Sequence, residues 1–150
     1  MIRIQEADFD LSTEITNLRK GDLQVGAVVS FLGTVRDLNE GSEVHSMTLE
    51  HYPGMTEKAL EAIVSQAKAR WDIRDTLIIH RVGSLKPEDQ IVLVAVTSAH
   101  RAEAFAACEF MMDYLKTAAP FWKKEETTDG GRWVDARVAD DAAMARWKKT

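Results

Sequence analysis

Cysteine is almost absent from this sequence, since Cys108 is the only one among 150 residues. A single cysteine excludes an internal disulfide and a zinc site built from several cysteines. Cys108 closes the apolar run 104–108, which is typical of the core side of a helix. We therefore interpret it as a small buried hydrophobe, and a catalytic thiol is the alternative.

An excess of positive charge is missing as well: 19 Lys and Arg residues stand against 24 Asp and Glu residues, a formal net charge of −5. A general nucleic-acid binder carries a basic face, so nucleic acid is not expected as a partner, and any anion site must be a local basic pocket. No apolar run approaches the length of a membrane span, and the N-terminus lacks a signal-peptide pattern. We expect a cytoplasmic protein with no membrane partner.

Recognisable metal and nucleotide motifs are lacking too. His45, His51 and His80 have no metal-ligand spacing with carboxylates or with one another. The sequence contains no Gly-rich phosphate loop and no recognisable serine triad. We therefore expect no metal and no cofactor.

The composition is that of an ordinary globular protein. Apolar residues make up 45% of the sequence, which is enough to form the core of one domain over residues 1–150. Hydrophobic periodicity separates helices from strands. It predicts helices over 11–18, 56–71, 98–117 and 141–148, and strands over 2–4, 25–33, 47–51, 76–82, 91–96, 121–126 and 132–134. Thr56 is the predicted N-cap of its helix, and the polar stretch 37–43 predicts a mobile loop. The mixed order indicates an α+β fold with a largely antiparallel sheet.

The segment 114–125 places three lysines among aromatic and apolar residues around a helix end. A lysine in apolar surroundings can release its proton more readily or hold an anion away from water. Along an extended strand Lys123 lies on the opposite face from Lys124, so we pair Lys116 with Lys123 and interpret Lys124 as a solvated charge. The alternative for Lys116 is a cation that complements the helix dipole.

Two further places carry basic side chains that suggest an anion. His100 and Arg101 lie at a predicted helix start, which favours anions over cations, so a bound phosphate or carboxylate explains them. The alternative is that Arg101 points to solvent and His100 caps a strand edge. Gly33 ends a predicted strand, and Arg36 after it offers a forked donor for phosphate. Arg137 is a lone basic candidate of weaker standing.

Four phrases, at 49–55, 97–101, 112–117 and 120–125, together resemble the large, catalytic subunits of molybdopterin synthase. Residues 31–36 and 132–134 also fit, so the resemblance extends from about Val25 to Arg137. It implies an α/β hammerhead-type core with an added antiparallel β portion. It also implies a homodimer at the centre of a heterotetramer, with a small ubiquitin-like subunit at each end.

The same resemblance implies a reaction. The small subunit carries a C-terminal Gly-Gly thiocarboxylate, which enters a pocket and donates sulfur. The substrate would be cyclic pyranopterin monophosphate (precursor Z), a pterin phosphate that receives two sulfurs to give molybdopterin.

Residue by residue, the resemblance makes Lys116 and Lys123 catalytic. The substrate-binding positions it implies are Thr34, Val35, Arg36, His100, Arg101, Lys124, Glu125, Phe31, Met112 and Arg137. His100 and Arg101 would reach the pocket from the other subunit of the dimer. Thr34 departs from the family pattern, because relatives often carry lysine there.

Two other functions remain open at this point. One is a non-catalytic dimer that docks a ubiquitin-like tail and holds a pterin phosphate for another enzyme. The other is a lysine Schiff-base enzyme that acts on small phosphosugars.

Overall fold

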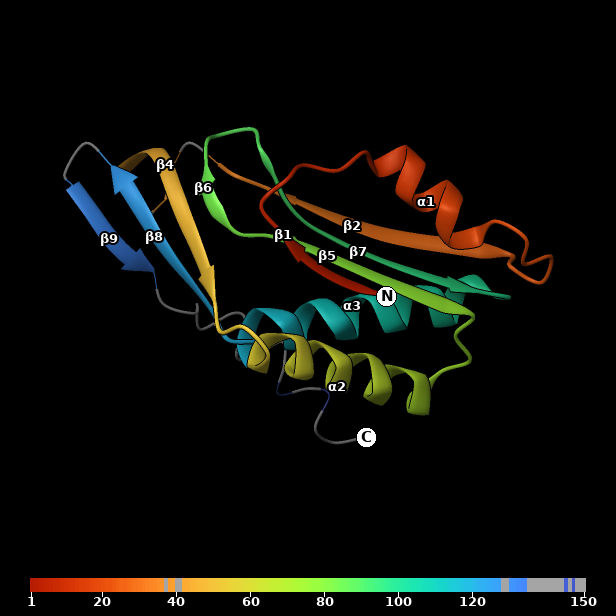
Figure 1. Ribbon diagram of the computed structural model, residues 1–150. Helices are drawn as coiled ribbons and strands as arrows, with labels where there is room; N and C mark the ends of the chain where they lie inside the picture. Colours follow the sequence, from red (N-terminus) through yellow and green to blue (C-terminus); the bar gives the residue numbers. More distant parts are fainter. Residues whose placement is uncertain (37, 40–41, 128–129, 135–144, 146, 148–150) are drawn as a thin grey trace.

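The computed structural model describes residues 1–36, 38–39, 42–127, 130–134, 145 and 147 (Figure 1). Two β-sheets lie side by side along the molecule, and helices cover the four-stranded one (Figure 1). Within the described residues, no helix is both long enough and apolar enough to cross a membrane.

The four-stranded sheet has the strand order β1-β5-β7-β2. Its strands are β1 (Ile2–Gln5), β2 (Ala27–Thr34), β5 (Asp75–Arg81) and β7 (Gln90–Ser98). β1 runs parallel to β5, while β5–β7 and β7–β2 are antiparallel. The apolar run predicted as a central strand is buried on both faces in β7. The prediction of an α+β fold with largely antiparallel strands is confirmed.

Three described helices cover this sheet from two sides: α1 (Leu11–Arg19) on one face, α2 (Met55–Arg70) and α3 (Arg101–Ala118) on the other (Figure 1). Successive residues of a strand point to opposite faces, so β5 and β7 contribute to both cores. Ile78 packs with α2 and α3, whereas Leu77 packs with α1. Alternate residues of β5 therefore hold α1 against one face of the sheet and the pair α2 and α3 against the other.

The second sheet extends beyond one end of the first. It contains β3 (Leu38–Asn39), β4 (Ser42–His51), β8 (Phe121–Thr127) and β9 (Gly130–Val134), and β6 (Gly83–Leu85) also pairs with β4. All of these pairings are antiparallel. This sheet corresponds to the added antiparallel portion, and β8 joins it directly to the end of α3.

The sheet has its own small core, formed by Val35, Met47, Leu49 and Leu85. Met47 and Leu49 are buried, which confirms the alternating pattern predicted for this strand. The predicted hairpin of β8 and β9 is also confirmed, with residues 128 and 129 outside the described part.

Three local predictions need correction or fall outside the described residues. Leu38 and Asn39 pair with Glu43 and Ser42 as a short ladder, where polar composition predicted a mobile loop. Backbone pairing depends on a neighbouring strand and not on side-chain polarity. Residues 37, 40 and 41 lie outside the described part, as does nearly all of the predicted helix 141–148.

The predicted N-cap at Thr56 is wrong. α2 begins after Gly54, whose φ of 87° suits glycine, and the Gly54 N–H donates to Glu57 Oε1 at 2.9 Å. Thr56 is instead buried: its Oγ1 accepts from Tyr52 N at 2.9 Å and donates to the Pro120 carbonyl at 3.0 Å. A tertiary contact therefore uses the hydroxyl that local sequence assigned to a cap.

Candidate active site

The predicted catalytic lysines lie on either side of the connection between α3 and β8. Lys116 is exposed in the last turn of α3, and Lys123 is partly buried in β8. Trp122, between Phe121 and Lys123, is 47% exposed, while its two neighbours are less exposed. The alternation confirms the extended strand that was used to separate Lys123 from Lys124.

His80, which has no metal-ligand spacing in the sequence, lies against Phe121, two residues before Lys123. The His80 ring stacks on the Phe121 ring, with centroids 3.8 Å apart and planes 14° from parallel. Its Nδ1–H donates to the Arg81 carbonyl at 2.8 Å. Burial lowers the pKa of His80 to about 4; the Arg81 carbonyl opposes this, and the charges of Lys116 and His51 add to it. His80 is therefore a neutral imidazole in the electrostatic range of Lys116.

The alternation of side-chain directions along β5 is a sequence signal that could have indicated that His80 is buried. His80 is two residues after Ile78, so both side chains face the α2–α3 layer. His80 shares this face of β5 with Thr76 and Ile78, both of them buried, and an ionisable side chain in such a row is unusual. What it contacts is not visible in the sequence, because Phe121 is 41 positions later.

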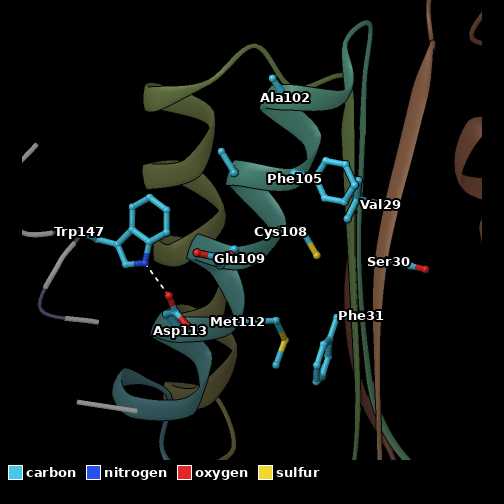
Figure 2. Close-up of a pocket in the computed structure, with 11 residues that line it drawn as sticks. Val29, Ser30, Phe31, Ala102, Phe105, Cys108, Glu109, Met112, Asp113 and Trp147 are labelled. Carbon is cyan, nitrogen blue, oxygen red and sulfur yellow. Dashed lines mark hydrogen bonds between the residues drawn. The ribbon is translucent and has the colours of Figure 1, made fainter. Parts of the chain in front are cut away.

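A cleft of about 670 Å³ opens between β2 and α3 (Figure 2). Phe31 and Met112 face each other across it, so the structure brings these two predicted pocket residues together (Figure 2). The lining also reaches across α3 to Trp147, whose Nε1–H donates to Asp113 Oδ2 at 2.6 Å (Figure 2). The residues along the cleft are Val29, Ser30, Phe31, Ala102, Phe105, Ala106, Cys108, Glu109, Met112, Asp113 and Trp147.

Cys108 borders this cleft but is buried, and its Sγ–H points to the Val94 carbonyl at 3.7 Å. Burial, with a smaller contribution from Glu109, raises the pKa of its thiol to about 11. A nucleophilic cysteine needs thiolate at neutral pH. The interpretation of Cys108 as a buried hydrophobe is confirmed.

The end of β2 carries three of the predicted substrate positions. The ladder with β7 shifts register between Gly33 and Thr34, and a Cβ at Gly33 would lie 2.8 Å from Val92 Cγ1. Thr34 and Arg36 are exposed, whereas Val35 is buried in the small core of the second sheet. The Val35 N–H donates to the Asp89 carbonyl at 3.0 Å, and its own carbonyl accepts from Glu88 N at 2.9 Å. Val35 thus anchors two exposed neighbours.

His100 and Arg101 are exposed at the opposite end of α3 from Lys116. His100 is the N-cap residue, and its side chain makes no capping hydrogen bond. At a rise of about 1.5 Å per residue, the 15 steps from Arg101 to Lys116 span roughly 22 Å. One chain does not bring these two groups of basic residues together.

The backbone of Gly26 holds the segment before His100. Its N–H donates to the Ser98 carbonyl at 2.9 Å, and a Cβ at this position would lie 2.3 Å from the Ala99 carbonyl oxygen. The His100 N–H in turn donates to Ser98 Oγ at 3.3 Å. Only glycine allows this approach without a backbone shift.

For Lys124 and Glu125 the structure describes the backbone alone: Lys124 pairs with Thr48 and Trp133, and Glu125 with Met47 and Arg132. Arg137 lies outside the described residues. Among the residues that are described, no three His, Cys, Asp or Glu side chains cluster as metal ligands.

Fold and site together define the class: an α+β protein with lysines at the junction of its helix layer and its second sheet, and an apolar cleft along the edge strand. A family model described as MoaE protein matches residues 4–118. The molybdopterin synthase catalytic subunit of Ralstonia nicotianae is 70% identical over 146 residues, which cover 97% of this chain and 83% of that protein.

Solved structures agree. The molybdopterin biosynthesis MoaE protein from Burkholderia ambifaria is 61% identical, with a TM-score of 0.85 over 99% of this chain and 97% of that one. A Helicobacter pylori complex of subunits 1 and 2 of molybdopterin-converting factor contains a chain 17% identical (TM-score 0.75, 91% of each chain), a likeness of fold alone. The present chain belongs to the MoaE family, the catalytic subunits of molybdopterin synthase, and is an enzyme of molybdenum cofactor biosynthesis.

Proposed function

We propose that this enzyme is a sulfurtransferase that converts cyclic pyranopterin monophosphate to molybdopterin. Two sulfurs would come from the thiocarboxylated Gly-Gly terminus of a small ubiquitin-like partner, in the cytoplasm. The observation that carries the proposal is the arrangement of Lys116 and Lys123 on the two elements that meet at Pro120, in a chain of this family.

Both reactants are anions, because one carries a thiocarboxylate and the other a cyclic phosphate. An acidic protein must therefore neutralise them locally. Lys116 would hold the carbonyl of the partner's terminus and stabilise the charge that develops as its sulfur is transferred. Lys123 would act on the pterin side, in proton transfer or in stabilising an oxyanion. Arg36, exposed at the end of β2, would bind the phosphate.

His100 and Arg101 complete the phosphate site in this proposal, supplied by a second copy of the chain. The roughly 22 Å along α3 that separates them from Lys116 supports a contribution in trans. Phe31 and Phe105 beside the cleft are 40% and 61% exposed, and such apolar exposure suits a surface that a second copy covers. The assembly would be a homodimer with a small subunit at each end.

The remaining pocket positions would shape the site around the substrate. Phe31 and Met112 line the cleft, Thr34 is exposed next to Arg36, and Val35 keeps both in place from the core of the second sheet. Lys124, Glu125 and Arg137 would add further contacts.

The test mixes the protein with a thiocarboxylated small subunit and the pterin phosphate, and measures molybdopterin. We expect product with the wild type, a loss of about 100-fold or more in Lys116→Ala, and unchanged product in the control Lys20→Ala, an exposed lysine beyond α1. No product from the wild type with competent partners would reject the proposal. A Lys116→Ala variant that loses only affinity would indicate a binding module.

A further inference from the structure

His80 is a buried titratable residue that the proposed chemistry does not use. It is only 4% exposed in β5, where it pairs with Ile4 of β1 and Val92 of β7. An aliphatic side chain would meet the packing needs of such a position, as Ile78 does two residues earlier. A buried imidazole instead needs hydrogen-bond partners, so its presence calls for a reason.

Two contacts hold the ring in one orientation and one tautomer. The Arg81 carbonyl can only accept, so the 2.8 Å contact places the hydrogen on Nδ1 and leaves the lone pair on Nε2. The stacked contact with Phe121 fixes the plane of the ring. The His80 side chain is therefore held in one fixed position.

Phe121 connects the His80 ring to the candidate site. It is the first residue of β8, it pairs with His51 of β4, and Lys123 follows two positions later on the same face. The preceding residue, Pro120, is held by Thr56 at the start of α2. The start of β8 is thus located by its ladder with β4 and by two further contacts, one to the backbone of Pro120 and one to the ring of Phe121.

The charges around His80 favour its neutral form. Lys116 approaches from α3 and His51 from β4, and both oppose a proton on the ring, whereas the Arg81 carbonyl on its own strand favours one. Burial decides the balance and keeps the pKa of His80 low. A neutral ring can lie beside the lysine site without repelling it.

We propose that His80 is a positioning residue, whose neutral imidazole acts through the stacked ring of Phe121 to place Lys123 for catalysis. This inference rests on the proposed function, because Lys123 has its role there. Without the imidazole ring, the start of β8 keeps the hydrogen bond from Thr56 to Pro120 but loses the stacking contact that orients Phe121. The expected result is slower chemistry with unchanged binding of the partner.

The test compares His80→Gln, which removes the ring, with His80→Phe, which keeps a ring for stacking. Ile78→Val is the matched control, because it perturbs the same face of β5 but leaves the stacked rings of His80 and Phe121 in place. We expect His80→Gln to lower kcat by about tenfold or more, with little change in KM or in the Kd of the small subunit. His80→Phe should recover most of the loss, and Ile78→Val should keep the wild-type kcat.

A double-mutant cycle with Phe121→Leu distinguishes positioning from simple loss of stability. If His80 acts through Phe121, the double variant is no slower than the slower single variant. Three outcomes would overturn the proposal. One is that the two single effects on kcat multiply in the double variant, and another is that folded His80→Gln keeps the wild-type kcat. The third is that the loss of kcat in every variant is explained by its loss of stability.

Amide hydrogen exchange of residues 121–123 provides a readout that needs no substrate. Faster exchange there in His80→Gln, but not in Ile78→Val, is expected. If the wild type forms no product, the proposed function fails, and unchanged exchange at these amides would separately overturn the role of His80.

Discussion

The low pKa of His80 predicts that the protein loses stability in mild acid. In the unfolded chain this histidine has an ordinary pKa of 6.5, whereas in the fold its pKa is about 4. Between these values the unfolded chain binds more protons, so the free energy of unfolding falls as pH falls. Above 6.5 both states are neutral and the contribution is fully present.

The magnitude follows from the two pKa values. A difference of about 2.5 pKa units corresponds to roughly 3 kcal/mol over the whole interval, of which about 2 kcal/mol is lost between about pH 7 and pH 5. Acidic residues held by hydrogen bonds also destabilise the fold when protonated; Asp8, bonded to Gln90, is one whose pKa is lowered. The His80 contribution must therefore be measured as a difference between two proteins.

The assay is urea unfolding of the wild type and of His80→Phe at one protein concentration and several pH values. The variant keeps the carboxylates but has no imidazole at this position, so its stability should decline less in acid, by about 2 kcal/mol between pH 7 and pH 5. Any constant cost of the larger ring cancels in this comparison. Parallel pH dependences in the two proteins would refute the reasoning.

Two further predictions concern other places in the fold. Gly26→Ala should cost about 1–3 kcal/mol in urea unfolding and reduce molybdopterin formation, because its Cβ would displace Ala99 and with it His100; wild-type stability and activity would contradict the close approach. Cys108 should resist a thiol reagent at neutral pH in the native protein and react fully in denaturant, because its thiol is buried and its pKa is raised to about 11; rapid labelling of the native protein would show that it is accessible.

Much of the secondary structure could be predicted because its signals are local. The continuous apolar run of β7 and the helical spacing before Trp71 each lie within about 20 residues, and the structure confirms both elements. The errors occur where a distant contact decides. Thr56 has the chemistry of an N-cap, but Pro120 and Tyr52 use its hydroxyl.

The candidate site shows the same division. The structure confirms β8 as the strand whose alternation separates Lys123 from Lys124 in the prediction, because side-chain direction along a strand has a fixed period. The surroundings of His80 could not be predicted from the sequence, because its neighbours Phe121, Lys116 and His51 come from three other elements. The buried anchoring role of Val35 was equally hidden, because the second sheet forms its core from separated strands.

By itself, the sequence determined most of the elements and the family resemblance, and it made Lys116 and Lys123 the predicted catalytic pair, because periodicity and motifs are properties of neighbouring residues. Only the tertiary structure decided that the His80 ring stacks on Phe121, and that Val35 lies in the core of the second sheet. The physical reason is that such contacts depend on how the two sheets pack against each other and against α3. Contacts between distant segments form only when the chain buries its apolar faces.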